Sequence, residues 1–399
     1  MKKLILSTLL LLLITPCLRA QRKEMSQARS YIKSGKELEK AEKMMTELLA
    51  KDSVCRANPK IYLLLYQALQ KQYEVGNEKL YLKQKYDTAA IFNLTKRMFT
   101  VLETLDSVDA IPDKKGRVVL EYRRKHASEL NTLRPNLFYG GTYYIRKTDY
   151  KTAFDFFSTY IECDRKPLFS GYDYQDNDKR MTDAAYWATY CGFKMNNPEK
   201  TLMYADTALH NIAKKKYTLR FIAEAYKAEK KDAQYVQILR TGFKEYPEYP
   251  YFLSRLMDYY TNADSLNEAL LLADKALAVD SDNELFMLAK STVLLNIGKY
   301  DDCISLSDSL IQKNDTLPEP YFNAGTAYLN KILILERDKQ TAKNKKQIKN
   351  LYKKARPYLE KYREYAPDNK DKWGHALYRI YLNLNMGKQF DEIDKILKN

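Results

Sequence analysis

The chain has 399 residues, with 67 Lys and Arg against 51 Asp and Glu, and its formal net charge is +16. It has only 12 Gly and 12 Pro, and 45% of its residues are hydrophobic and 30% charged. This composition is typical of a folded, helix-rich protein and excludes disorder as the main state of the chain. A mean hydropathy of -0.56, with one apolar run at the N-terminus, also excludes a protein with several membrane spans.

The first twenty residues have the pattern of a secretory signal peptide. Two lysines precede the uncharged stretch 4–14, and small residues lead to Ala20, after which we predict cleavage. As a helix the uncharged stretch would span about 16 Å, roughly half of a hydrocarbon core. The alternative is lipidation at Cys17, which the preceding Pro16 disfavours. Both interpretations predict an exported protein, either periplasmic or associated with the outer membrane.

Four cysteines follow the predicted signal peptide: Cys55, Cys163, Cys191 and Cys303. They show no CxxC or metal-ligand spacing, so no zinc site is predicted. Cys163 and Cys191 are expected on consecutive helices, which leaves open either one disulfide or two buried thiols. Buried thiols are the commoner arrangement in helical cores.

A 34-residue period runs through the middle of the chain. Thr201, Tyr235, Ala269 and Cys303 are spaced by 34 residues. Mostly small residues recur four and seven positions after each of them, which places a stripe on one helix face where a neighbouring helix can approach closely. A second helical segment precedes each stripe, so each unit is predicted to be a helical hairpin.

The period and its residues resemble the tetratricopeptide repeat (TPR) family, of a secreted or periplasmic bacterial type. The best match consists of Leu137, Gly140, Gly141, Tyr144, Tyr150, Ala153, Phe157 and Tyr160. A second match consists of Tyr321, Ala324, Gly325 and Tyr328 and, after an insertion, Ala355, Leu359, Tyr362 and Pro367. The resemblance implies an all-α superhelical solenoid of about nine helix-turn-helix hairpins.

This organisation predicts five parts of the chain. In chain order they are the signal peptide 1–20, divergent TPR-like hairpins 21–106, a linking helix or insert 107–133, a core array 134–369, and a capping hairpin 370–399. The linking segment is expected to hold a helix from Arg117 to Leu133. The core array has two inserts. That at 166–181 is predicted to be a surface loop, and that at 331–350 either extends two helices or forms a mobile loop between them.

No catalytic motif is present in the sequence. It contains no GxGxxG, GxxxxGK[ST], HExxH or GxSxG, and its three histidines, His126, His210 and His375, are far apart. We therefore predict no enzymatic activity, no cofactor and no metal.

The TPR resemblance implies that the first helix of each hairpin lines a groove where extended peptides or partner helices dock. Mapped onto this sequence, the groove candidates are Phe138, Arg146, Tyr186, Tyr190, Phe193, Lys194, Arg220, Lys227, Asn262, Asn296 and Asn330. The three asparagines recur at 34 residues. They mark either helix ends, where Asn tolerates a left-handed backbone, or a ladder of amides that binds the main chain of a peptide. Helix ends alone predict Asn there, which favours the first interpretation.

Charge is uneven along the chain. The net charge is +8 over Lys331–Arg356 and +5 over residues 114–125, but -7 over residues 250–320. Nucleic acid is not predicted as a partner, because export removes most access to it. The run Lys331–Arg356 is predicted to be a solvated helix face or a peripheral contact with an anionic envelope surface.

These observations predict a non-catalytic protein-interaction scaffold in the bacterial cell envelope, which binds an envelope protein or peptide in the groove. The alternative is an outer-membrane-associated glycan- or peptide-binding protein for nutrient uptake. In that case Tyr172 and Tyr174 would form an exposed platform for a sugar.

Overall fold

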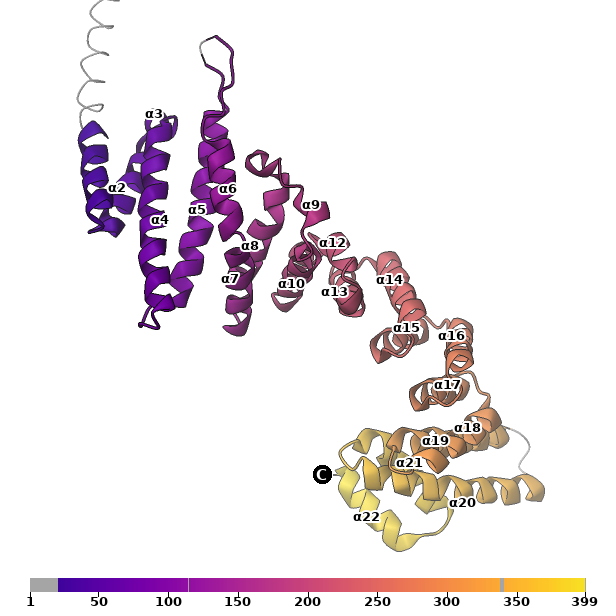
Figure 1. The fold of residues 1–399 in the computed structure, drawn as a ribbon. Helices are drawn as coiled ribbons and strands as arrows, with labels where there is room; N and C mark the ends of the chain where they lie inside the picture. The colour runs from indigo at the N-terminus through magenta and orange to yellow at the C-terminus, as the bar shows by residue number, and fades with distance from the viewer. Residues whose placement is uncertain (1–20, 114, 338–340, 399) are drawn as a thin grey trace, which may run out of the picture. The chain divides into compact units, whose positions relative to one another are not determined.

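The computed structural model describes residues 21–113, 115–337 and 341–398, and this part of the chain is helical, without β-strands. It divides into two compact units, Met1–Lys231 and Asp232–Asn399 (Figure 1). The predicted signal peptide, its cleavage site and Cys17 lie outside the described residues.

The first unit contains four helical hairpins with a common apolar core. In chain order they are residues 21–34 with α2 (Leu38–Lys51), α4 (Pro59–Tyr81) with α5 (Thr88–Asp109), α7 (Pro135–Arg146) with α8 (Tyr150–Glu162), and α10 (Met181–Lys194) with the broken helix α11 (Pro198–Leu202) and α12 (Ala205–Leu209). The helix α13 (Lys215–Ala228) ends the unit. Shorter connecting helices are α3 (Ser53–Arg56), α6 (Arg123–Leu133), η1 (Cys163–Arg165), η2 (Pro167–Phe169), α9 (Tyr174–Asn177) and η3 (Ile212–Lys214).

The second unit begins with α14 (Asp232–Glu245) and continues with four hairpins. These are α15 (Pro250–Asn262) with α16 (Leu266–Val279), α17 (Glu284–Asn296) with α18 (Tyr300–Lys313), α19 (Pro318–Arg337) with α20 (Ala342–Tyr365), and α21 (Lys370–Asn383) with α22 (Gly387–Lys398). The two units together hold eight helix pairs within the described residues, and the boundary between the units falls between α13 and α14. The prediction of an all-α solenoid of hairpins is confirmed.

One type of turn explains the 34-residue period. A residue with left-handed backbone lies two positions after the first helix ends, at Thr148, Asn196, Lys230, Asp264, Gly298 and Asn385. The next amide donates to the carbonyl oxygen five residues earlier, as from Ser265 to Tyr260 at 2.8 Å. This Schellman pattern satisfies carbonyls at the helix end. The turn is absent from α19, where Ile332 occupies the corresponding position inside the helix and is buried.

Glycines let the two helices of a hairpin approach closely. A Cβ atom on Gly140 would lie 2.7 Å from Phe156 Cε1, and one on Gly141 would lie 2.6 Å from Phe157 Cζ. Both distances are shorter than a carbon–carbon contact allows. The glycines of the TPR-like match are therefore packing positions between α7 and α8.

The helix of the linking segment is shorter than predicted. α6 begins at Arg123, six residues after the predicted start at Arg117. The reason is a turn upstream, in which the Asp113 carboxylate accepts from the backbone N–H of Lys115 and Arg117 and from the Arg117 guanidinium. Asp stabilises such turns by bonding to backbone amides a few residues ahead.

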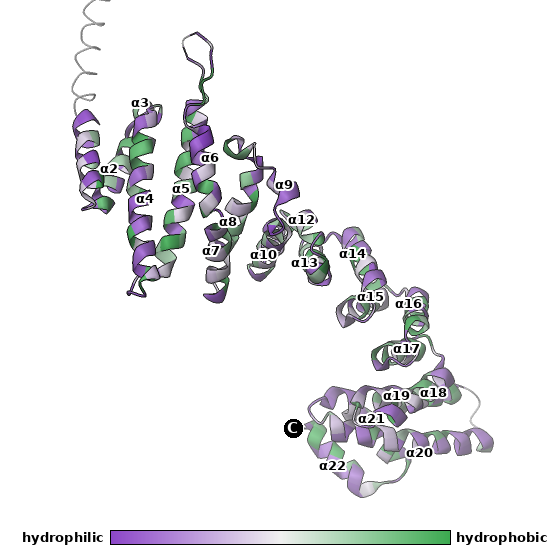
Figure 2. Cartoon of the chain, viewed as in Figure 1, coloured by the Kyte–Doolittle hydropathy of each residue, from purple (hydrophilic) through white to green (hydrophobic). Residues whose placement is uncertain are grey.

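The two inserts have different structures. Residues 166–181 lie largely at the surface, but Leu168, Phe169 and Tyr174 are buried, and the short helices η2 and α9 lie within the segment. Its apolar side chains join the core, where Phe169 stacks on Phe99 with ring centroids 5.8 Å apart. The insert at 331–350 extends two helices, since α19 has 20 residues and α20 has 24. Figure 2 shows mostly hydrophilic residues at the projecting end of α20.

The four cysteines of the described chain are buried free thiols. Of the two alternatives left open for Cys163 and Cys191, the structure therefore has two buried thiols. Burial raises the pKa of each of these two thiols to about 12.

Candidate functional site

The predicted groove residues of α10 meet α13 in a cluster of aromatic rings. Tyr186, Tyr190 and Phe193 are spaced by four and three residues, which places them on one face of α10. The ring centroids of Tyr186 and Tyr190 lie 6.0 and 5.8 Å from that of Phe221 on α13. Phe193 stacks on Phe221 at 4.7 Å. We name as the aromatic face the side chains of Tyr150, Tyr186, Trp187, Tyr190, Phe193 and Phe221.

The aromatic face is anchored in the core but keeps exposed edges. Phe221 and Tyr186 are buried, whereas Trp187, Tyr190 and Phe193 are half-buried. Rings of this kind offer apolar area together with the Tyr hydroxyl and Trp N–H groups, at little cost in side-chain entropy. The arrangement is therefore suited to contact another polypeptide.

Basic side chains lie over the rings of this face. Lys194 Nζ is 5.6 Å from the centroid of Tyr150, and the Arg220 guanidinium carbon is 5.9 Å from that of Phe193. Lys214 Nζ lies 4.8 Å from Tyr186 and also pairs with Asp183 Oδ1 at 2.7 Å. These cation–π contacts hold positive charge beside apolar area.

A small cavity adjoins one end of the aromatic face. It has a volume of about 160 Å³ and lies between Phe193, Pro198 and the α13 residues Glu224 and Ala225. A cavity of about 150 Å³ accommodates a benzene-sized group. Burial and the neighbouring Tyr150 raise the pKa of the Tyr190 hydroxyl.

The other groove candidates of the first unit lie apart from this cluster. Phe138 packs within its own hairpin, with its ring centroid 5.5 Å from Phe157 and 5.8 Å from Tyr160. Arg146 and Lys227 are exposed near the C-terminal ends of α7 and α13. Their role in binding stays a prediction.

The three asparagines lie in the second unit and do not share one position. Asn262 and Asn296 are the exposed last residues of α15 and α17, whereas Asn330 lies within α19. The left-handed residues of the two turns are Asp264 and Gly298. The explanation of these asparagines by a left-handed backbone is therefore wrong, because the left-handed position comes two residues later. The amide-ladder interpretation stays untested.

Sequence reasoning missed three members of this site. Trp187 lies beside Tyr186, and its ring centroid is 5.6 Å from that of Tyr190. Phe221 lies at the centre of the cluster, although only its neighbour Arg220 was among the predicted groove residues. Tyr150 comes from α8, a third helix beside α10 and α13. The run of aromatic residues in "AAYWATYCGF" is a signal for Trp187, but the sequence has none for Tyr150.

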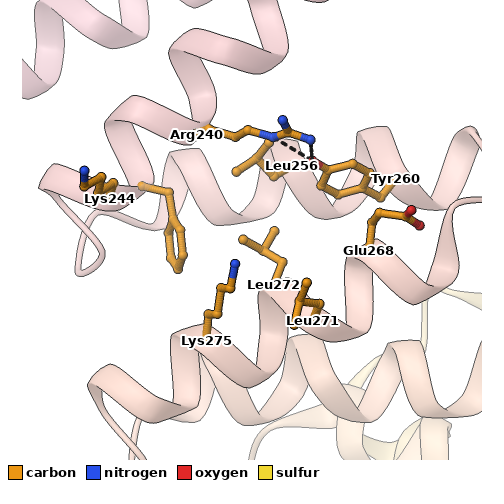
Figure 3. Close-up of a pocket in the computed structure, with 9 residues that line it drawn as sticks. Arg240, Lys244, Leu256, Tyr260, Glu268, Leu271, Leu272 and Lys275 are labelled. Atoms are coloured by element: carbon orange, nitrogen blue, oxygen red, sulfur yellow. Dashed lines mark hydrogen bonds between the residues drawn. The ribbon is translucent and has the colours of Figure 1, made fainter.

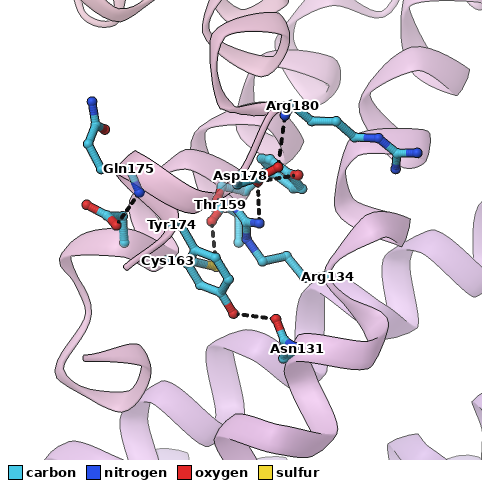
Figure 4. A network of polar contacts seen from close by, with 10 residues as sticks. Asn131, Arg134, Thr159, Cys163, Tyr174, Gln175, Asp178 and Arg180 are labelled. Carbon is cyan, nitrogen blue, oxygen red and sulfur yellow. Dashed lines mark hydrogen bonds and ion pairs between the residues drawn. The ribbon is translucent and has the colours of Figure 1, made fainter. Parts of the chain in front are cut away.

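A buried ionic network, shown in Figure 4, holds the segment that was predicted to bind sugar. Arg134 Nη1 donates to Asp178 Oδ2 at 2.5 Å, and the Tyr160 hydroxyl donates to the same oxygen at 2.6 Å. The Arg134 guanidinium carbon lies 3.7 and 3.8 Å from the ring centroids of Tyr160 and Tyr174. The Tyr174 hydroxyl donates to Asn131 Oδ1 at 2.7 Å.

Tyr174 is therefore part of the core and cannot form an exposed sugar platform. Its neighbour Tyr172 stacks on it at 5.4 Å and is only half-buried. The platform predicted from Tyr172 and Tyr174 is wrong, because the Tyr174 ring packs against the buried Arg134 guanidinium.

The described residues of the basic run Lys331–Arg356 belong to the end of α19 and the first half of α20, and most of their basic side chains are exposed. Four lysines of α20 surround a shallow surface hollow: Lys343, Lys346, Lys349 and Lys353. Leu333 and Ile334 of α19 are exposed as well. The described residues contain no cluster of three or more His, Cys, Asp or Glu that could hold a metal, and no described helix is long and apolar enough to cross a membrane.

No family model and no curated protein matches the chain. Solved structures of TPR proteins do. The C-terminal part of a TPR repeat-containing protein from Cytophaga hutchinsonii is 13% identical over 65% of this chain and 93% of that one, with a TM-score of 0.45. The TPR domain of P58(IPK) is 13% identical over 92% of this chain and 98% of that one, with a TM-score of 0.31. Yeast Tom70 is 12% identical over 92% of this chain and 89% of that one, with a TM-score of 0.35.

These identities and TM-scores are low, so the assignment rests on the helix pairs and their turns at 34-residue spacing. The fold is a TPR-like solenoid. Stacked hairpins of this kind form one continuous core and leave an extended surface for contacts.

Proposed function

We propose that the chain is an exported scaffold protein of the bacterial cell envelope, which binds a peptide or helix of an envelope protein at the aromatic face. The observation that carries this proposal is the convergence of α10 rings on Phe221 of α13, with Tyr150 of α8 against Tyr190 and with Lys194 and Arg220 beside the rings. Export is supported by the sequence of residues 1–20.

The side chains of the aromatic face indicate which kind of partner segment would bind there. Tyr, Trp and Arg are the residues that most often carry binding energy at protein interfaces. A segment with one apolar or aromatic anchor fits the cavity beside Phe193, and carboxylates next to the anchor would pair with Lys194. We therefore expect an acidic peptide or helix with an apolar anchor.

Crosslinking of the tagged chain in its native envelope tests this function. The captured protein should be lost in Tyr190→Ala, because this change removes a half-buried ring of the aromatic face, and circular dichroism would verify that the fold persists. Tyr81→Ala is the matched control, since Tyr81 is 85% exposed on α4 and lies outside the aromatic face. Capture that is equal in both variants, or no capture above background, contradicts the proposal.

A second proposal concerns the basic end of the α19–α20 hairpin. We propose that the lysines of α20 contact an anionic surface of the envelope, with Leu333 and Ile334 beside them as exposed apolar residues. Basic segments bind anionic lipid with about 1 kcal/mol per charge near the surface, and salt screens this attraction. Binding to phosphatidylglycerol vesicles that weakens in Lys346→Glu/Lys349→Glu and at high salt supports it. Equal binding to neutral vesicles contradicts it.

A further inference from the structure

The second unit contains a cavity of about 450 Å³ between α14, α15 and α16. Its apolar lining comes from Phe243 on α14, Leu256 on α15, and Leu271 and Leu272 on α16 (Figure 3). The volume lies within the range of about 300–1,000 Å³ that is typical of small-molecule sites. Leu271 is 55% exposed, so the cavity leaves apolar surface in contact with solvent.

Basic side chains surround this apolar cavity. Arg240 donates from Nε and Nη2 to the Tyr260 hydroxyl oxygen at 2.9 and 2.6 Å, which fixes both side chains at one end. Lys244 and Lys275 are exposed in the lining, and Figure 3 shows Lys275 reaching from α16 toward the cavity. Neither lysine has an ion-pair partner within the described ranges. Glu268 is the acidic residue of the lining, so positive charge prevails there.

The corresponding gap one repeat later provides an internal comparison. The residues 34 positions after Leu256 and Leu271 are Lys290 and Ser305. Lys290 and Ser305 both line a second, polar hollow. In that hollow, Lys290 Nζ pairs with Asp274 Oδ1 at 2.8 Å. The repeat fold therefore accepts polar and charged residues at these positions. Leucine at positions 256 and 271 is therefore not a requirement of helix packing, whereas Leu272 corresponds to Leu306 and is apolar in both gaps.

We propose that this cavity binds a small amphiphilic carboxylate, such as a medium-chain fatty acid. The alkyl chain of the ligand would lie against Phe243, Leu271 and Leu272, and its carboxylate would pair with Lys244 or Lys275. The alkyl chain of such a ligand would exclude water from the leucines, and the two lysines would favour a negatively charged head group. At the next gap Leu256, Leu271 and Lys275 are replaced by Lys290, Ser305 and Ser309, so this combination of apolar and basic side chains does not continue along the unit. That fits a small molecule better than a long partner helix. This site is independent of the aromatic face, which lies in the other unit.

Isothermal titration of the purified full chain with dodecanoate, below its micelle concentration, tests the proposal. We expect saturable binding of one molecule per chain. The double variant Leu271→Ser/Lys275→Ser should weaken binding at least tenfold, because it introduces the residues found at Ser305 and Ser309 of the polar hollow. Both substituted side chains are exposed, so the fold should persist, as circular dichroism would verify.

Two further titrations separate the contribution of the ligand's carboxylate from that of its alkyl chain. Lys275→Ser alone should weaken dodecanoate about two- to fivefold, the effect of an exposed charge pair, and leave dodecan-1-ol unchanged. Ser309→Ala, in the polar hollow, should leave both ligands unchanged. The proposal is overturned if dodecanoate shows no saturable binding, if the double variant binds as the unchanged chain does, or if the alcohol binds as tightly as the acid.

Discussion

Replacement of Arg134 by Ala is expected to destabilise the first unit strongly. Arg134 is 5% exposed, and it donates to Asp178 Oδ2 at 2.5 Å and to the Tyr160 carbonyl oxygen at 3.0 Å. Its removal leaves the Asp178 carboxylate in a largely buried site and removes two cation–π contacts, with Tyr160 and Tyr174. Breaking a buried ion pair from one side costs about 3–5 kcal/mol in free energy of unfolding.

The two tryptophans of the chain make this loss measurable in the first unit alone. Trp187 lies in the first unit and Trp373 in the second. In a Trp373→Phe background, urea unfolding followed by Trp187 emission reports on the first unit. With a denaturant slope of about 2 kcal/mol/M, the expected loss lowers the urea midpoint by about 2 M.

Arg124→Ala is the matched control, because Arg124 is an exposed arginine of α6. Its effect on the free energy of unfolding should stay within about 0.5 kcal/mol. Equal midpoints for the two variants would refute the reasoning, since they would show that the buried network contributes no more than a surface charge.

Three shorter predictions concern packing, thiols and pH. Gly141→Ala should destabilise the first unit by about 1–3 kcal/mol in the same fluorescence assay, because its Cβ would meet a phenylalanine ring of α8 at 2.6 Å. Gly171→Ala, where a Cβ meets nothing within 4 Å, is its control, and equal losses would contradict the packing argument. Cys55, Cys163, Cys191 and Cys303 should all react with a thiol reagent after unfolding without reductant, and Cys163 and Cys191 should be protected in the folded chain at pH 8. Only two reactive thiols among these four would indicate a disulfide. Burial raises the pKa of Asp178, but hydrogen bonds from a tyrosine and an arginine outweigh burial and hold this pKa below its usual range. Its contribution to stability is therefore full above the unfolded pKa of about 3.9 and is lost as the pH falls through the lower folded pKa. Asp178→Asn should flatten the stability profile of the first unit in this acid range, and an unchanged profile would show that Asp178 does not contribute.

The solenoid could be predicted from the sequence because its 34-residue period depends on residues that lie close together along the chain. Small residues such as Ala269 and Ala273 recur on the packing stripe, and both are fully buried. The left-handed turn residues Asn196, Lys230, Asp264 and Gly298 keep the same spacing, although their types differ. A turn that any of four residue types can form leaves no motif, and only the period reveals it.

The buried network could not be predicted in the same way. Arg134 and Asp178 are 44 residues apart, and a charged pair carries no sequence pattern that separates a buried position from an exposed one. Tyr174 was expected to be exposed for this reason. Similarly, Phe221 was missed because the groove was mapped by period alone, and the period does not show which rings of neighbouring helices meet.

Residue-specific photo-crosslinking in the native envelope tests the central claim most directly. A photoreactive benzoylphenylalanine at position 187 would sit on the aromatic face, and the same group at position 81 would sit on an exposed site of α4. The account predicts that position 187 crosslinks to one segment of one envelope protein and that position 81 does not. The same products from both positions, or none from position 187, would contradict it.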